Sequence, residues 1–269
     1  MTPNALLLAH DKPTALRPDQ LRQFEELGYL ILPGFLDRDL VARMKPEVDR
    51  WVDDGLRARS IDSVKDPEKF GVPPVMELEL PAHGELITWS PLLGILDQLM
   101  GAPYAFHHLH SDRQAPDVPG KPWHHDYEHS TQTDRSATMI HALHYLDGLS
   151  TDTSSLVVLP GSHRERADKT ARVHLGTGPL PGEVVLEELP PGSTVVLHSA
   201  LFHARRPRPG GLGKPRYFVD ASYCEVGPLW PPVKPYWRYM LRRARELNLA
   251  PDRPQLFTEL TFAEYGGAA

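Results

Sequence analysis

The segment "KPWHHDYEHS", residues 121–130, gathers side chains that can bind a metal. It contains His124, His125, Asp126 and His129 directly after a tryptophan. In an extended strand, side chains two positions apart point to the same face, so His124 and Asp126 can converge on one ion while His125 points away. Two protein ligands are too few to hold a redox metal. A third ligand must therefore come from elsewhere in the chain.

A second histidine-bearing segment, "GSTVVLHSALFHARR", offers His198 and His203 as candidates for the third ligand. Two imidazoles and one carboxylate on one face of an octahedral metal leave about three positions open, which is the arrangement used by non-haem Fe(II) oxygenases. The chain has a single cysteine, Cys224, which excludes a thiolate-rich zinc site. Any metal site must therefore use imidazole and carboxylate ligands.

Charge and hydropathy patterns argue against several classes of partner. The chain has 35 acidic and 29 basic residues, mixed along its length, so nucleic acid is not an expected partner. No stretch approaches the roughly 20 apolar residues of a membrane span, and the run "ALLLA" near the N-terminus is too short for the core of a signal peptide. We therefore expect a cytoplasmic protein that acts on a small molecule, with neither a nucleic-acid nor a membrane partner.

Proline punctuates the part of the chain that carries these histidines. The sequence has 28 prolines in 269 residues, about twice the usual share. From about residue 104, prolines and glycines separate short apolar runs, a pattern typical of a sandwich or jelly roll. The sequence predicts one domain over 1–269, mainly β with flanking helices, and with a double-stranded β-helix (jelly-roll, cupin-like) core. We place helices at about 17–100, the jelly-roll core at about 104–226, and a helix and tail at about 235–269.

The N-terminal part is expected to run helix, strand, helix. Apolar residues at helical spacing precede Gly28, which ends the first helix, and "YLILPGF" then reads as a short strand. A second apolar stripe extends from Leu40 to Trp51. Residues 57–76 are polar, contain prolines and show no periodicity, so they are predicted to form a loop.

These motifs together resemble the phytanoyl-CoA dioxygenase family of Fe(II)- and 2-oxoglutarate-dependent oxygenases. "LRQFEELGYLILPGFL" is similar to the family's N-terminal helix and strand, and "PWHHDY" resembles its metal motif. "LVVLPGSHR" resembles its central motif, and "GSTVVLHSALFHA" followed by "KPR" is similar to its closing block. The four landmarks occur in the family's order, and the resemblance covers most of the chain.

The resemblance implies a role for individual residues. It makes His124, Asp126 and His203 the iron ligands, whereas His198 matches a mid-strand position. It makes Arg216 the partner of the distal carboxylate of 2-oxoglutarate, since a guanidinium offers a charged fork that matches a carboxylate. Arg113 corresponds to a basic residue that contacts the co-substrate in some relatives. The implied cofactors are Fe(II), 2-oxoglutarate and O2, with release of succinate and CO2.

Four further residues are candidates for the substrate pocket. Tyr127 and His129 follow the metal pair directly, and Tyr145 shares one strand face with His141 and Leu143. Arg205 stands where many relatives have a small hydroxyl residue, so it either turns away or joins a carboxylate-binding site. The many Arg and His residues around these motifs favour an anionic or carboxylate-bearing substrate.

The function expected on these grounds is hydroxylation of an unactivated C–H bond in a small molecule, in natural-product or amino-acid tailoring. Halogenating relatives lack the carboxylate ligand, a position that Asp126 fills in this chain. The alternative is a cupin-like Zn or Ni hydrolase, or a binding protein, that uses the same triad without O2 chemistry. An oxygenase needs Arg216 and consumes 2-oxoglutarate, whereas a hydrolase has no use for either.

Overall fold

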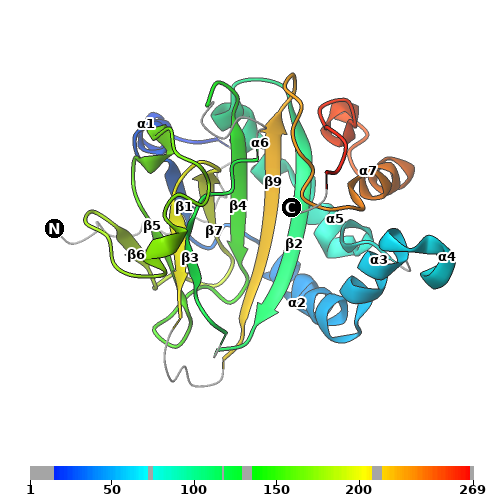
Figure 1. The fold of residues 1–269 in the computed structure, drawn as a ribbon, viewed down its shortest axis with the longest axis horizontal. Coiled ribbons are helices and arrows are strands. Elements are labelled where there is room, and N and C mark those ends of the chain that lie inside the picture. Colours follow the sequence, from blue (N-terminus) through cyan, green and yellow to red (C-terminus); the bar gives the residue numbers. More distant parts are fainter. Residues whose placement is uncertain (1–14, 72–74, 117, 129–134, 208–213, 267–269) are drawn as a thin grey trace.

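The computed structural model describes residues 15–71, 75–116, 118–128, 135–207 and 214–266. Two antiparallel sheets face one another (Figure 1). The strand order is β1-β7-β4-β9-β2 in the major sheet and β3-β8-β5-β6 in the minor sheet. Neighbouring strands are mostly distant in sequence, as in a jelly roll, and the predicted fold class is confirmed.

The strand bounds show that both sheets combine segments that are far apart in the chain. The major sheet consists of β1 (Tyr29–Leu32), β7 (Ser193–His198), β4 (Met139–Tyr145), β9 (Arg216–Glu225) and β2 (Tyr104–Gln114). The minor sheet consists of β3 (Lys121–His124), β8 (His203–Arg206), β5 (Ser155–Val158) and β6 (Val184–Leu186). The predicted core boundaries agree with β2 and β9, but β1 also joins the major sheet, where it pairs with β7.

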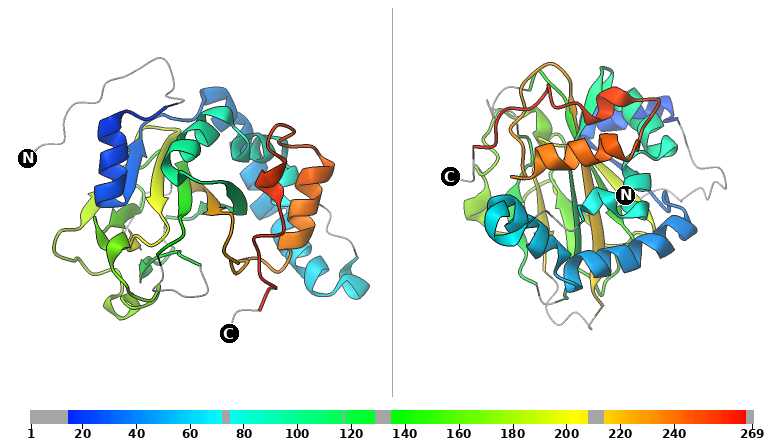
Figure 2. Two further views of the ribbon diagram at one scale, coloured as in Figure 1. Left: turned by 90° about the horizontal axis from the view of Figure 1, so that it is seen from above. Right: turned by 90° about the vertical axis from the view of Figure 1, so that its right-hand side faces the viewer.

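The major sheet is covered on both faces, because its outer face lies under helices and its inner face looks toward the minor sheet (Figures 1 and 2). All seven residues of β4 are buried as a result. The longer helices are α1 (Pro18–Leu27), α2 (Arg38–Asp53), α3 (Leu56–Lys65), α6 (Ser90–Met100) and α7 (Trp237–Glu246). The shorter ones are α4 (Pro67–Phe70), α5 (Pro81–Ile87) and the 3-10 turns η1 (Glu77–Glu79), η2 (Ser162–Arg164), η3 (Val173–Leu175) and η4 (Pro254–Phe257).

The prediction of a loop over residues 57–76 was wrong. Most of that stretch forms α3 and α4. Ser60 and Ser63 are buried although they are polar, because their hydroxyls donate to the carbonyls of Val75 and Phe70. Leu56 and Ile61 also pack against apolar neighbours, but two apolar positions are too few for a hydrophobic stripe, so a search for hydrophobic periodicity misses this helix.

A buried polar network attaches the helical layer to the major sheet. Glu47 of α2 accepts hydrogen bonds from the backbone N–H groups of Ala82 and His83 and lies 2.8 Å from Nδ1 of His83. Nε2 of His83 in turn lies 2.8 Å from Oγ of Ser111 on β2. The chain of contacts links α2, α5 and β2, so it positions the helices behind the strand that borders the pocket described below.

Two of the sequence landmarks contact each other. Gly28 ends α1 with φ +79°, and a Cβ atom at this position would lie 2.5 Å from Nδ1 of His163 in "PGSHR". His163 donates from Nε2 to the carbonyl of Glu25 in the last turn of α1. The glycine therefore permits both the left-handed turn and the close approach of the imidazole. None of the helices in the described part of the chain is long and apolar enough to cross a membrane.

Candidate metal centre and co-substrate pocket

His124 and His203 meet on adjacent strands of the minor sheet. His124 is the last residue of β3, His203 is the first of β8, and the two are paired antiparallel with ring centroids 4.3 Å apart. Asp126 lies beyond the end of β3, where its N–H donates to the carbonyl of Ser199. Its carboxylate lies 3.1 Å from Nε2 of His203 and 3.6 Å from Nε2 of His124. The predicted convergence occurs, although Asp126 itself lies beyond the last residue of the strand.

The hydrogen bonds of the two imidazoles show that the triad fits a divalent metal. Nδ1 of His124 contacts the carbonyl of Pro122 at 2.7 Å, and Nδ1 of His203 contacts that of Leu201 at 3.0 Å. A carbonyl can only accept, so each Nδ1 carries a proton, and Nε2 on the side of Asp126 is the atom that each ring would offer to a metal. Nε2 of His124 is buried and has no hydrogen-bond partner.

The charge state of the triad also suits a metal. Burial, assisted by the neighbouring His203, lowers the pKa of His124 to about 3, so the ring is neutral at neutral pH. Burial opposes ionisation of Asp126, but His203 and Lys121 together hold the pKa of its carboxyl well below the usual range. One anionic oxygen and two imidazole lone pairs form the donor set that Fe(II) and related ions prefer.

The triad opens onto a cavity of about 290 Å³ that also contains Arg216. Arg216 begins β9 and is 7 % exposed. Its Nε and Nη2 donate to Oε1 of Gln114 at 3.1 and 2.5 Å, and its guanidinium lies over the rings of Tyr145 and Phe218. Burial lowers the pKa of Arg216 to about 10, so the group remains charged at neutral pH. Its hydrogen bonds in the described chain go to an amide and a carbonyl, which leaves the charge without a carboxylate partner.

Of the other predicted site residues, some line the cavity and others do not. Tyr145 and Arg205 line the cavity, together with His141 and Leu143 as the strand alternation predicted. Tyr127 is fully buried, and its hydroxyl donates to the carbonyl of Ala137 instead of facing the cavity. His129 lies outside the described residues.

Arg113 is placed away from this cavity. Its guanidinium bonds at 2.5 Å to Asp49 and again at 2.5 Å to Asp53, both on α2. The side chain lies on the opposite face of β2 from the residues that line the cavity, such as His108 and His110. The structure therefore offers no contact through which Arg113 would meet the co-substrate.

Two other histidines of the motifs are accounted for by packing. His125 turns away from the triad, with Nε2 3.0 Å from the carbonyl of Ala167. His198 stacks against Tyr127, and its Nδ1 accepts the N–H of Ala200. Neither belongs to the cluster formed by His124, Asp126 and His203.

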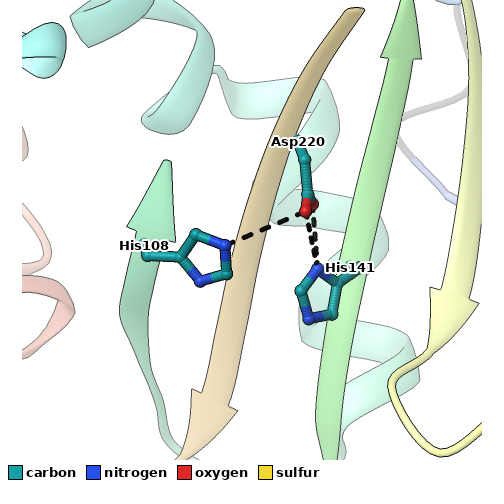
Figure 3. A group of neighbouring side chains, drawn as sticks. All are labelled: His108, His141 and Asp220. Atoms are coloured by element: carbon teal, nitrogen blue, oxygen red, sulfur yellow. Dashed lines mark hydrogen bonds and ion pairs between the residues drawn. The ribbon is translucent and has the colours of Figure 1, made fainter. Parts of the chain in front are cut away.

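Sequence reasoning missed a second polar cluster on the opposite wall of the same cavity, formed by His108, His141 and Asp220 (Figure 3). Both carboxylate oxygens of Asp220 accept from Nδ1 of His141, at 2.9 and 3.0 Å. Nε2 of His108 lies 3.9 Å from Asp220. Alternation could have revealed Asp220, because counting by two from Arg216 along β9 passes through Phe218 and reaches Asp220 on the same face.

The arrangement as a whole defines a jelly-roll protein with a two-histidine, one-carboxylate centre and a buried arginine in the same pocket. The family model described as "Phytanoyl-CoA dioxygenase (PhyH)" matches residues 24–208. Dioxygenase trt7 of Aspergillus terreus is 26 % identical over 214 residues, which cover 76 % of this chain and 72 % of the relative. The ectoine dioxygenase of Bordetella parapertussis is 26 % identical over 157 residues, which cover 56 % and 51 %.

Solved structures agree on the fold. HygX from Streptomyces hygroscopicus, crystallised with nickel and 2-oxoglutarate, superposes with a TM-score of 0.59 at 19 % identity, over 81 % of this chain and 90 % of that one. The chain belongs to the phytanoyl-CoA dioxygenase family. It is a 2-oxoglutarate-dependent dioxygenase, and Fe(II), 2-oxoglutarate and O2 are the cofactors of its chemistry, as its motifs predicted.

Proposed function

We propose that His124, Asp126 and His203 hold Fe(II) and that Arg216 binds the distal carboxylate of 2-oxoglutarate. The observation that carries this assignment is the shared cavity, in which a buried guanidinium without a carboxylate partner accompanies a triad with an unpartnered imidazole nitrogen. A buried charge is costly unless it is paired. A dicarboxylate whose other end chelates the metal would satisfy both groups at once.

The chain's own residues orient the co-substrate. Gln114 fixes the guanidinium of Arg216 through its amide oxygen, and the guanidinium lies over the rings of Tyr145 and Phe218. His124, Asp126 and His203 would supply three ligands to an octahedral ion, which would leave open positions for co-substrate and O2. When bound, iron and 2-oxoglutarate supply the O2-derived oxidant that takes a hydrogen atom from a C–H bond, with succinate and CO2 as co-products.

The substrate is a small molecule that enters the same cavity. The volume of about 290 Å³ lies at the lower end of the range of ligand pockets. Arg205 and Lys234 line the cavity beside Arg216, and their charges favour an anionic or carboxylate-bearing substrate. The expected reaction is hydroxylation in amino-acid or natural-product tailoring, and the similarity to ectoine dioxygenase supports a compact substrate.

The proposed reaction is tested by incubating the Fe(II)-loaded protein with 2-oxoglutarate, ¹⁸O2 and a panel of amino acids and small carboxylates. A substrate should raise succinate formation above the substrate-free rate and yield a product that carries one oxygen atom from ¹⁸O2. Omission of 2-oxoglutarate should abolish the product. A product that forms without O2 and 2-oxoglutarate, with Zn(II) in place of iron, would support the hydrolase alternative instead.

A further inference from the structure

The second cluster in the cavity is built much like the first. His108 comes from β2, Asp220 from β9 and His141 from β4, three adjacent strands of the major sheet (Figure 3). One ligand atom from each of the three lies within 4.8 Å of the others, as is also true of the iron triad. His108 and His141 are 7 % and 2 % exposed. The two clusters line opposite walls of one cavity.

A relay of hydrogen bonds fixes which nitrogen of His108 is protonated. Nε2 of His107 lies 3.0 Å from the carbonyl of Pro231, so it must carry the proton, and Nδ1 of a neutral His107 is then an acceptor. Nδ1 of His108 lies 3.0 Å from that acceptor and 2.7 Å from Oγ of Ser222. Two lone pairs would repel at 3.0 Å, so Nδ1 of His108 carries a proton. The Nε2 atom of a neutral His108 is therefore a bare lone pair.

That lone pair lies beside a carboxylate. Nε2 of His108 is 3.9 Å from Oδ2 of Asp220, and both atoms are acceptors, so no hydrogen bond can join them. Orientation of one ring nitrogen by a bond to the other is the usual way in which proteins prepare a histidine ligand. The third ligand atom of the cluster, Nδ1 of His141, also faces the carboxylate of Asp220, at 2.9 and 3.0 Å from its two oxygens. A cation would relieve the repulsion between Nε2 of His108 and the carboxylate of Asp220, and His141 could serve as its third ligand.

We propose that His108, His141 and Asp220 form a second divalent-cation site, of the class that binds Zn(II). Two imidazoles and one carboxylate, without a thiolate, suit zinc and its neighbours in the first transition series. Binding displaces the proton on Nδ1 of His141. From a doubly protonated ring this proton passes to solvent, and in a neutral ring it moves to Nε2, which has no hydrogen-bond partner in the described structure. The cation keeps open positions on the cavity side, where it can take an oxygen or nitrogen atom of a ligand. The inference does not depend on the proposed oxygenase reaction.

The test uses Zn(II) alone and a protein whose iron site is blocked. Metal-free protein carrying His124→Ala and His203→Ala is titrated with Zn(II) against a chromophoric chelator, and bound zinc is counted after desalting. The blocked protein should bind one Zn(II) per chain. Adding Asp220→Asn or His108→Gln should weaken this binding at least about 10-fold. Two substitutions are used because either alone could disturb folding, which is checked by thermal unfolding.

A matched substitution controls for surface binding. Asp112 also lies on β2, but it pairs with Arg57 and belongs to neither cluster. Asp112→Asn in the blocked protein should leave the zinc count at one. If the blocked protein binds no zinc, or binds it equally well after both Asp220→Asn and His108→Gln, the site does not exist, and Asp220 and His141 are simply a hydrogen-bonded pair in the cavity wall.

Discussion

Nε2 of His203 lies 3.1 Å from the carboxylate of Asp126, although the two residues belong to different segments of the chain. The contact exists because β3 and β8 pair antiparallel with His124 opposite His203. The N–H of Asp126 bonds to Ser199, in the turn that precedes His203, and so holds the carboxylate against both imidazoles. The geometry of the metal centre therefore depends on the pairing of two short strands, β3 and β8.

Arg216 is expected to dominate the affinity for 2-oxoglutarate. Arg216→Met should weaken binding by roughly 10- to 100-fold, because it removes a charge-assisted contact to a carboxylate. Anaerobic calorimetry with metal-loaded protein measures the effect. The matched control is Arg113→Met, whose guanidinium bonds to Asp49 and Asp53 outside the cavity and whose loss should leave the affinity unchanged. Equal weakening by both substitutions would restore the co-substrate role expected for Arg113 from the sequence.

Arg205 is expected to add positive charge to the cavity, and so to favour an anionic substrate, without anchoring the co-substrate. Its Nη2 donates to the carbonyl of Pro119, and burial lowers the pKa of its guanidinium. Arg205→Ser restores the small hydroxyl residue that many relatives have at this position. We expect the affinity for 2-oxoglutarate to change by less than about threefold, whereas Arg216→Met changes it by at least about 10-fold. Calorimetry on both variants measures the two affinities. A larger loss of 2-oxoglutarate affinity in Arg205→Ser than in Arg216→Met would show that Arg205 anchors the co-substrate.

Glu47 is expected to be important for stability because it accepts from His83 and two backbone N–H groups. Glu47→Gln should cost roughly 2–4 kcal/mol in the free energy of unfolding at pH 7. Glu85→Gln, which removes an exposed pair with Arg43, should cost about 0–1 kcal/mol. Urea unfolding of the two variants measures both values, and similar costs would show that the buried network does not anchor the helices.

The cost of Glu47→Gln should also depend on pH. Burial tends to raise the pKa of Glu47, but hydrogen bonds from His83 and Ala82 outweigh it, and the pKa lies below its usual value of 4.5. A carboxylate with a lowered folded-state pKa stabilises the protein above its unfolded-state pKa and loses that contribution as pH falls through the folded-state value. The difference between wild type and Glu47→Gln should therefore be constant near neutral pH and shrink below about pH 4.5. A difference that grew on acidification would contradict this assignment.

Substitutions at Gly28 and Gly101 can separate two costs of adding a Cβ atom: backbone strain at positive φ and collision with a neighbouring side chain. Both end a helix at positive φ, but a Cβ at Gly28 would collide with His163, whereas Gly101 has nothing within 4 Å. Gly101→Ala should cost about 1 kcal/mol for the left-handed backbone alone. Gly28→Ala should cost about 1–3 kcal/mol more, because the imidazole must move. Thermal and urea unfolding measure both costs. If Gly28→Ala and Gly101→Ala lowered the free energy of unfolding equally, the close approach of His163 to Gly28 would not matter for stability.

The extent to which the sequence predicted this protein depended on how local each signal was. The end of α1 at Gly28 and the buried face of α2 followed from short-range patterns, and both agree with the structure. The helix at Leu56–Lys65 was missed because only Leu56 and Ile61 supply apolar contacts, and buried serine hydroxyls supply the rest. No hydrophobic pattern in the sequence reports such side-chain hydrogen bonds.

In the site, too, residues that belong to a motif were predicted and residues placed by tertiary contacts were not. His124, Asp126 and His203 could be selected because their motifs resemble those of a family, and the fold brings them together. Asp220 carries no motif, and only its register with Arg216 along β9 places it in the cavity. Arg113 was assigned a contact to the co-substrate by analogy with relatives. In the structure it forms ion pairs with Asp49 and Asp53 of α2, which the sequence could not reveal.

The most direct test of the account is an anaerobic titration of the metal-free protein with Fe(II) and 2-oxoglutarate, monitored by visible absorption. The proposed site predicts a weak charge-transfer band from the chelate in the wild type, which should be absent in His203→Ala and should require far more 2-oxoglutarate in Arg216→Met. If no band forms in the wild type, or if it persists unchanged in His203→Ala, then His124, Asp126 and His203 do not form the iron site and the assignment is wrong.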